Sequence, residues 1–304
     1  MNKILILGAK GNLGQQLVKV FSPDYDMIAW DRGEIDITDR DLIIKKVSEL
    51  KPSIIVNAAA YNAVDKCEES EAEYDLAKRI NIDGPKFLAE ACLSIGSTLI
   101  HYSTDYVFNG EKKSGYEEND EPKPINRYGK SKFHGEKRVL ELSGRGLKWY
   151  LIRTSKLFGP KSLSEASKPS FFELMLKRSE NMGKIINNKT ASDGVVTPGA
   201  EQAIEVVNDE VSCFTYTPDL AQATKNLVQS DKGYGIYHLT NSGACTWYQA
   251  AVELFEAAKI NLKVIPISSE KLARPAKRPK YSILLNTKLT PLRDYRDALR
   301  EHLT

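Results

Sequence analysis

The chain has 304 residues, of which 41% are hydrophobic and 27% are charged, enough for one large or two unequal domains with a sizeable core. The 43 basic and 40 acidic side chains leave a net charge of only +3, so no global field points to nucleic acid or to a membrane surface. No apolar run approaches about 18 residues, and Met1 leads directly into an apolar strand with no room for a signal peptide. We therefore expect a cytoplasmic protein with no membrane or nucleic-acid partner.

The N-terminal residues have the order of a dinucleotide-binding unit. Residues 3–7 form an apolar run of strand length, Gly8, Gly11 and Gly14 follow in GAKGNLG, and residues 15–21 continue in helical composition. The glycines permit a tight turn, and a helix N-terminus presents free N–H groups to a pyrophosphate. The spacing is GxxGxxG rather than GxGxxG, and the alternative is an ordinary glycine-rich turn.

The residues after the second apolar stretch, 27–30, bear on the choice of cofactor. Asp31 can accept a hydrogen bond from a ribose hydroxyl and repels a 2′-phosphate, which favours NAD. Arg32 beside it, and Lys10 in the glycine loop, can pair with that phosphate. The sequence leaves both cofactors open, and we expect NADPH with NADH as the alternative.

Strand and helix signals then alternate through the first half of the chain. Helices are predicted at 39–50, 71–95 and 131–142, and strands at 53–57, 98–103 and 149–153. This alternation predicts an α/β fold, a Rossmann-type doubly wound parallel sheet with helices on both faces. Ligands bind such sheets outside the carboxyl ends of the strands, where Gly8, Asp31, Ala58 and Thr104 fall.

The second half is less regular. Residues 161–170 and 187–199 are predicted as loops and 171–177 as a helix, and strand or helix signals return at 203–207, 218–229, 235–239, 246–258 and 262–267. We expect residues 1–160 to form the dinucleotide-binding domain and 214–240 to return to it. Residues 161–213 and 241–304 would build a smaller, discontinuous C-terminal substrate-binding lobe.

Three residues suggest how a carbonyl is protonated. Tyr128 and Lys132 lie one turn apart on a predicted helix, and an ammonium near a phenol lowers the pKa of the phenol. Thr104 ends the predicted strand in HYSTDYVF, where its hydroxyl can bond the same carbonyl oxygen. The alternatives are a packed tyrosine, a solvated lysine and a capping threonine. The glycine turn upstream favours the catalytic interpretation.

The remaining candidate ligand residues are scattered. Cys67, Cys92, Cys213 and Cys245 form no CxxC motif, so we expect reduced thiols. The histidines His134 and His238 are isolated, and we expect no metal site.

Eight segments resemble those of the extended short-chain dehydrogenase/reductases and, within them, of the dTDP-4-dehydrorhamnose reductase family. They are GAKGNLG (8–14), DITD (36–39), VNAAAYNAVDKCE (56–68), HYSTDYVFNG (101–110), YGKSKFHGE (128–136), LIRTS (151–155), YHLTNSGACTWYQ (237–249) and RPAKRPKYSILLNTKL (274–289). The resemblance implies NAD(P)H-dependent reduction of the 4-keto group of a nucleotide-linked 6-deoxy sugar. In this family dTDP-4-dehydro-L-rhamnose becomes dTDP-L-rhamnose, a precursor of cell-surface polysaccharide.

The resemblance also implies roles for single residues. Thr104, Tyr128 and Lys132 match the catalytic trio of the family. The residues that match its cofactor contacts are Gly8, Lys10, Gly11, Asn12, Leu13, Asp31, Arg32, Asp36, Ile37, Ala58, Ala59, Ala60, Tyr61, Tyr128 and Lys132, with Thr154 and Ser155 beside the nicotinamide. Those expected near the sugar are Val64, Thr104, Asp105, Tyr106 and Tyr128.

Three departures from the family pattern fall on the substrate side. Lys156 stands where the family usually has tryptophan, and it either contacts the sugar or turns to solvent. The segment DEVSCFT (209–215) lacks the glycine and proline of the family's DQxGxPT, and an apparent insertion lies between about 183 and 203. A different nucleotide sugar therefore stays open. The basic run that contains Arg278, in 274–280, is either a clamp for the nucleotide diphosphate or a solvated loop.

Other functions share the scaffold. A nucleotide-sugar dehydratase needs a glutamate after Thr-Asp, and Tyr106 stands there instead. A nucleotide-sugar epimerase would share the glycines and the YxxxK pattern and keep its NAD bound. A non-catalytic NADP-binding relative, such as the regulatory subunit of methionine adenosyltransferase, would not need the trio, so its retention favours catalysis. Whether the protein is a monomer or a homodimer stays open.

Overall fold

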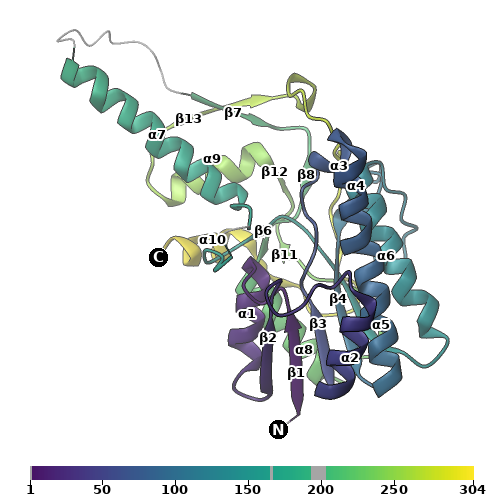
Figure 1. Ribbon diagram of the computed structural model, residues 1–304. Coiled ribbons are helices and arrows are strands. Elements are labelled where there is room, and N and C mark those ends of the chain that lie inside the picture. The colour runs from purple at the N-terminus through teal and green to yellow at the C-terminus, as the bar shows by residue number, and fades with distance from the viewer. Residues whose placement is uncertain (1, 165–166, 193–202) are drawn as a thin grey trace.

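The computed structural model describes residues 2–164, 167–192 and 203–304, and its centre is a six-stranded parallel sheet (Figure 1). The strands are β1 (Lys3–Leu7), β2 (Asp26–Trp30), β3 (Ile54–Asn57), β4 (Thr98–Thr104), β5 (Lys148–Thr154) and β10 (Gly235–His238). Their order across the sheet is β10-β5-β4-β3-β1-β2. The predicted Rossmann-type parallel sheet is confirmed, and its strand order reverses direction between β1 and β3.

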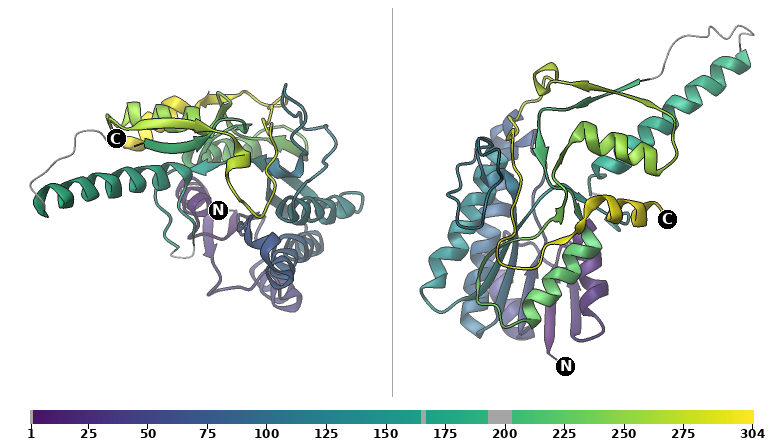
Figure 2. Two further views of the ribbon diagram at one scale, coloured as in Figure 1. Left: turned by 90° about the horizontal axis from the view of Figure 1, so that it is seen from above. Right: turned by 180° about the vertical axis from the view of Figure 1, so that it is seen from behind.

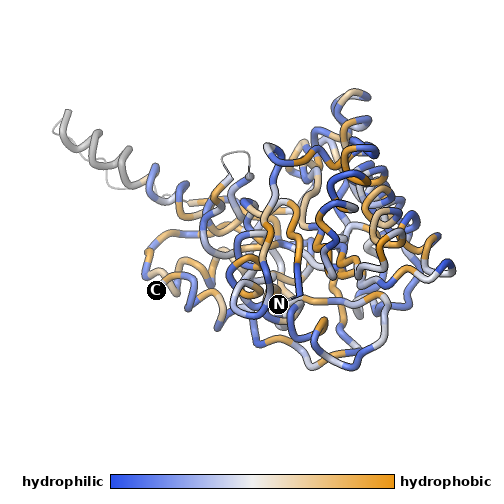
Figure 3. Tube along the Cα trace, turned by 60° about the horizontal axis from the view of Figure 1, so that its bottom comes forward, coloured by the Kyte–Doolittle hydropathy of each residue, from blue (hydrophilic) through white to orange (hydrophobic). Residues whose placement is uncertain are grey.

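Helices cover both faces of the sheet because its strands are apolar on both sides. Ile4 and Ile6 of β1 face α1 (Asn12–Phe21) and α8 (Thr217–Gln229), whose apolar side chains share their core. Leu5 and Leu7 point the other way, into the core of α2 (Arg40–Leu50), α5 (Gly84–Ile95) and α6 (Arg127–Ser143). Hydrophobic and hydrophilic stretches accordingly alternate along these helices (Figure 3).

The long helix predicted at 71–95 is interrupted by a short π-helix. The short α3 (Lys66–Glu69) precedes α4 (Glu71–Lys78), and the π-helix Arg79–Asp83 joins α4 to α5. A Cβ added to Gly135 of α6 would lie only 2.0 Å from the carbonyl oxygen of Asn81. The π-helix therefore approaches α6 closely, and Gly135 makes that approach possible.

A second core lies beyond the carboxyl ends of the parallel strands. It unites apolar side chains of α7 (Phe171–Ser192), α9 (Trp247–Ala257) and α10 (Tyr295–Leu303), among them Phe172, Leu254 and Tyr295. Short paired strands complete this part: β6 (Leu157–Phe158) with β9 (Thr215–Tyr216), β8 (Val211–Ser212) with β12 (Cys245–Thr246), β7 (Ala203–Val207) with β13 (Lys263–Ile267), and β11 (Asn241–Ser242) with β14 (Leu292–Asp294). The right-hand view of Figure 2 shows this part above the sheet, and α8 beside α1 lower in the molecule.

One predicted loop is partly wrong. Residues 187–192 belong to α7, which continues to Ser192, whereas 193–199 lie outside the described residues. The two asparagines of 187–192 each cost a helix only about 1 kcal/mol or less, and the lysines and the alanine near them are strong helix formers. In the described part of the chain, no helix combines the length and the apolar composition that a membrane crossing requires.

Candidate active site

The glycine loop turns sharply at the end of β1. Gly8 has φ +73°, and its carbonyl oxygen accepts a hydrogen bond from the N–H of Gly11 at 3.0 Å. A Cβ added to Gly14 would lie 2.0 Å from the Gly8 oxygen, and one on Gly8 would lie 2.8 Å from the Ala59 nitrogen. Backbone therefore packs against backbone here, and a side chain at Gly8 or Gly14 would collide with the neighbouring main chain.

The start of α1 has the properties of a pyrophosphate site. Gly11 is the N-cap residue of α1, and it has no side chain that could accept a hydrogen bond from the first turn. The Asn12 carbonyl oxygen Oδ1 is buried and has no hydrogen-bond partner in the described part of the chain. Exposed donors at a helix N-terminus together with a narrow glycine loop fit an anionic dinucleotide. Leu13, by contrast, is buried in the core beneath the loop.

The residues after β2 surround this loop. The Asp31 carboxylate accepts hydrogen bonds from the backbone N–H of Lys10 at 3.0 Å and of Arg32 at 2.8 Å. The side chains of Lys10 and Arg32 are exposed beside it. Asp36 is also exposed and bonds Thr38, whereas Ile37 is buried. Within the described residues neither Lys10 nor Arg32 has an ion-pair partner, so two unpaired cations flank the glycine loop, together with a carboxylate that accepts from the loop's backbone.

The loop after β3 is fixed by an asparagine that the sequence motifs do not reveal. Ala58, Ala59 and Ala60 are half-buried and Tyr61 is buried. The Asn81 side chain accepts from the Tyr61 N–H at 2.9 Å, and it donates to the Tyr61 oxygen and to Ser131, both at 3.0 Å. The local sequence gives no signal for Asn81; in the structure it lies on the π-helix, and such turns are frequent at functional sites.

The three predicted catalytic residues come from the end of β4 and the first turns of α6. Thr104 and Tyr128 are buried, and Tyr128 shares an apolar cluster with Val64 and Tyr106. The Tyr106 ring packs edge-on against Tyr128 with centroids 5.9 Å apart. Burial raises the pKa of Tyr128, and the nearby Thr104 hydroxyl opposes that rise. The Tyr128 hydroxyl itself donates to the side-chain oxygen of Asn62 at 3.5 Å. The two hydroxyls that were predicted to act on one carbonyl therefore lie together.

Lys132 is oriented differently from the sequence expectation. Its Nζ donates to the carbonyl oxygen of Tyr102 at 2.7 Å, and burial lowers its pKa to about 8. The sequence predicted that Lys132 would lower the pKa of Tyr128, whereas the dominant effect at Tyr128 is burial, which raises it. The Lys132 ammonium is thus bonded to the backbone of β4 rather than to the Tyr128 hydroxyl.

Asp105 links Thr104 to the second core. Its Oδ1 accepts from the Thr104 hydroxyl at 3.0 Å, and its Oδ2 accepts from Ser282 at 2.6 Å and from Ser212 at 3.2 Å. Burial raises the pKa of Asp105, and these hydrogen bonds oppose the rise. Ser212 and Ser282 were not predicted, because nothing in their local sequence relates them to a residue more than 100 positions earlier.

The end of β5 is tied to the altered segment 209–215. The Thr154 hydroxyl donates to Thr215 at 3.3 Å, and the Ser155 hydroxyl donates to the carbonyl of Cys213 at 2.5 Å. Lys156 follows with φ +42°, and its Nζ lies 3.6 Å from the centroid of the Trp247 ring. The Lys156 ammonium therefore turns into the second core rather than to solvent.

Arg278 is already paired within the protein. Its guanidinium donates to Asp65 in a bidentate pair, at 2.5 and 2.6 Å, and nearby Arg274 pairs with Glu210. Lys277 and Lys280 of the same run are exposed. The basic run is thus half ion-paired and half solvated, and the diphosphate clamp stays a prediction.

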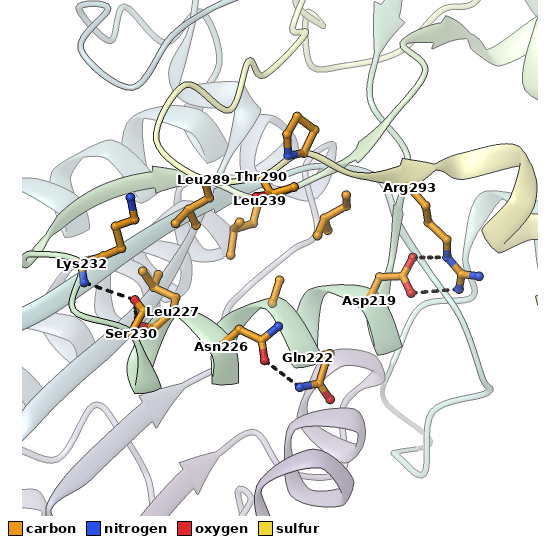
Figure 4. A pocket seen from close by; sticks show the side chains of 13 residues that line it. Asp219, Gln222, Asn226, Leu227, Ser230, Lys232, Leu239, Leu289, Thr290 and Arg293 are labelled. Carbon is orange, nitrogen blue, oxygen red and sulfur yellow. Dashed lines mark hydrogen bonds and ion pairs between the residues drawn. The ribbon is translucent and has the colours of Figure 1, made fainter.

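A separate cavity of about 490 Å³ lies between α8 and residues 289–293 (Figure 4). Leucines 227, 239, 289 and 292 contribute to its walls, and the ion pair of Asp219 with Arg293 borders it. It shares no residue with the catalytic trio. Within the described residues, no cluster of histidine, cysteine or acidic side chains is arranged to hold a metal ion.

The chain resembles known proteins over its whole length. The family model of the RmlD substrate binding domain matches residues 1–304. The dTDP-4-dehydrorhamnose reductase of Streptomyces griseus is 36% identical over 98% of this chain and 91% of that protein. A probable dTDP-4,6-dihydroxy-2-methyloxan-3-one 4-ketoreductase of Streptomyces antibioticus is 34% identical over 98% of this chain and 93% of that protein.

A solved structure agrees with these matches. The dTDP-4-dehydrorhamnose reductase of Bacillus anthracis str. Ames, crystallised in complex with NADP, superimposes with a TM-score of 0.86 and 33% identity, covering 99% of both chains. Fold, motifs and full-length similarity point the same way: the chain belongs to the dTDP-4-dehydrorhamnose reductase family.

Proposed function

We propose that the protein reduces the 4-keto group of dTDP-4-dehydro-L-rhamnose with NADPH and so forms dTDP-L-rhamnose. The observation that carries the proposal is that the buried Thr104 and Tyr128 hydroxyls lie close together, at the same sheet edge as the glycine loop. NADH is the alternative cofactor. The B. anthracis relative, which is bound to NADP, and the unpaired cations at Lys10 and Arg32 both favour NADPH.

The residues around the glycine loop would hold the cofactor. Gly8, Gly11 and the N-terminus of α1, with Asn12 and Leu13, receive the pyrophosphate, and Asp31 or Arg32 meets the adenosine ribose. Asp36 and Ile37 lie toward the adenine, one by hydrogen bond and one by packing. The remaining contacts are assigned to Ala58, Ala59, Ala60, Tyr61, Thr154 and Ser155.

The protein's own groups would act on the sugar oxygen. The bound nicotinamide supplies the hydride. Tyr128 donates the proton, and general acid catalysis of this kind contributes roughly 10²–10⁴-fold. The Thr104 hydroxyl, which donates to Asp105 in this structure, turns to the same oxygen and stabilises its charge by about 2–4 kcal/mol. Lys132, whose Nζ donates to the Tyr102 carbonyl oxygen in this structure, binds the nicotinamide ribose.

We infer that residues 1–160, with 214–240, form the cofactor half, and that 161–213 and 241–304 form the substrate half. Two observations support this division. Strand β10 pairs with β5 in the parallel sheet, and α8 packs against α1. The second core draws its side chains mainly from α7, α9 and α10. Val64, Asp105 and Tyr106 would then meet the sugar between the halves, and Arg278 would lie near the diphosphate.

We further infer that the protein works in the cytoplasm without a nucleic-acid partner. All four cysteines are unpaired thiols, which suits a reducing compartment. The net charge of +3 is too small to attract a polyanion over a distance.

The substitution Tyr128→Phe tests the proposal. We expect kcat for NADPH oxidation with dTDP-4-dehydro-L-rhamnose, followed at 340 nm, to fall at least about 100-fold, because the proton donor is lost. NADPH affinity, measured by fluorescence, should stay within about threefold of the wild type, since only a hydroxyl is removed. Tyr234→Phe is the control, because Tyr234 is 51% exposed and lies at the far end of the sheet.

The assay also separates the competing functions. Near-normal turnover by the Tyr128 variant would refute the assignment of the acid. A non-catalytic relative would be supported if the wild-type protein binds NADPH but none of the 4-keto nucleotide sugars causes its oxidation. Turnover restricted to another dTDP-4-keto sugar would match the S. antibioticus relative and redefine the substrate.

A further inference from the structure

Lys156 connects β5 to the second core in a strained backbone conformation. Its φ of +42° lies in the left-handed region, which lysine rarely adopts. Its carbonyl oxygen accepts from the N–H of Thr215 at 3.2 Å, so the residue is fixed in this conformation. Backbone strain of this kind in a non-glycine residue is concentrated at active sites and ligand-binding sites.

The Lys156 ammonium is buried against aromatic rings and lacks a hydrogen-bond acceptor. It lies 3.6 Å from the ring centroid of Trp247 and 5.1 Å from that of Phe214. The indole N–H of Trp247 donates to Glu210 at 3.0 Å, which turns the ring's face toward the ammonium. Within the described residues, Nζ has no hydrogen-bond partner.

This arrangement leaves three strong donors unused. Attraction to an aromatic face compensates only part of the lost hydration of an ammonium, since the ring accepts no conventional hydrogen bond. Lys156 as a whole is only half-buried although its Nζ is buried, and the rotatable bonds of the side chain would let the ammonium leave Trp247. An oxygen acceptor in that position would satisfy donors that the protein leaves unsatisfied.

The acceptor would lie close to the reacting carbonyl. The Ser212 hydroxyl lies within hydrogen-bond distance of Asp105, at 3.2 Å, and of Ser155, at 3.3 Å, and Asp105 accepts from Thr104. Lys156 is therefore one residue away from a chain of hydrogen bonds that ends at the catalytic threonine. The charge of Lys156 also acts on Asp105, where it opposes the rise in pKa that burial causes.

We propose that Lys156 is a specificity-determining residue that leaves Trp247 and donates hydrogen bonds to a hydroxyl or carbonyl oxygen of the bound sugar next to C4. The inference rests on the proposed function for the identity of the nucleotide sugar. The protein should therefore prefer nucleotide sugars that have an oxygen next to C4 within reach of the Lys156 ammonium.

Calorimetric titration with dTDP and with dTDP-L-rhamnose, each in the presence of NADP⁺, isolates the sugar's contribution to binding. For Lys156→Met we expect the Kd for dTDP-L-rhamnose to rise at least about tenfold, as the loss of hydrogen bonds from a charged donor requires. The Kd for dTDP should stay within about twofold. Lys156→Arg, which keeps donors and charge, should retain most of the affinity for the sugar nucleotide.

Lys288→Met is the matched control, because Lys288 also lies over an aromatic ring, that of Tyr237, and bonds the carbonyl oxygen of Ile236 on the edge strand β10. It should change neither Kd. Equal weakening of both ligands in the Lys156→Met variant, or no weakening of either, would overturn the inference. Failure of the proposed function is separate, since wild-type protein would then bind these ligands without reducing dTDP-4-dehydro-L-rhamnose.

Discussion

Lys156 affects stability in a direction that depends on pH. Burial lowers its pKa to about 8, well below the value near 10.4 in an unfolded chain. Below pH 8 the folded state must hold the lysine charged, which costs stability. Between about pH 8 and 10.5 the unfolded state binds more protons than the folded state, so this cost disappears as pH rises.

We therefore predict that Lys156→Met is more stable than the wild type at pH 7, by an order of 1–3 kcal/mol. The difference should shrink toward zero by about pH 10.5, because the lysine is then neutral in the folded state and about half neutral in the unfolded state. Urea unfolding of the two proteins at pH 7 and pH 10 measures it. A difference that does not change with pH would show that the ammonium is not desolvated.

At the same scale, the sequence predicted residues that lie in motifs and missed those that act through distant contacts. Thr104 and Tyr128 meet, as expected from a strand end and a helix on one sheet edge. Asn81, Ser212 and Ser282 come from segments whose local sequence contains no signal of the site. The orientation of Lys132 was also unpredictable, since it depends on which acceptor β4 offers.

At the scale of elements, a buried ion pair joins β5 to α6, the helix that carries the tyrosine. Arg153 donates two hydrogen bonds to Glu136, at 3.0 and 2.8 Å, and the two side chains are 2% and 0% exposed. Because neither charge reaches water, each depends on the other. The pair thereby fixes α6 against the strand that ends beside the site.

We predict that Arg153→Met lowers the free energy of unfolding by about 3–5 kcal/mol, because it leaves a buried carboxylate unpaired. The double variant Arg153→Met, Glu136→Leu should regain much of this loss. Arg138→Met is the control, since its partner Glu141 is exposed and such pairs contribute about 1 kcal/mol or less. Urea unfolding compares all three. A small loss in the first variant would mean that water reaches Glu136.

Elements of ordinary length were predictable, and exceptional or very short ones were not. The strands 3–7 and 98–103 have apolar runs that periodicity detects, and both are confirmed. The π-helix Arg79–Asp83 depends on the close approach of Gly135, which is a tertiary contact. Strands such as β8 and β12 have two residues each, too few to show a pattern.

At the scale of the whole molecule, late segments complete an early core. The edge strand β10 and helix α8 follow α7 in sequence, yet β10 pairs with β5 and α8 covers α1. Leu220, Ala221 and Leu227 of α8 cover Leu17 and the sheet beneath it. The N-terminal half thus cannot bury one face of its sheet by itself.

We predict that a chain ending at residue 160 lacks a stable fold, because this face would be exposed to water. Urea unfolding followed by circular dichroism should show a broad, non-cooperative change in the fragment and a single sigmoidal transition in the full chain. A fragment with a sharp transition of its own would contradict the prediction.

The position of β10 has a consequence during protein synthesis. The ribosome makes β5 long before it makes residues 235–238. Until then the edge of β5 in the nascent sheet is unpaired, and the apolar face that α8 covers is exposed. Chaperone demand should therefore peak while the middle of the chain is being translated, and it should end once the strand that closes the sheet leaves the exit tunnel.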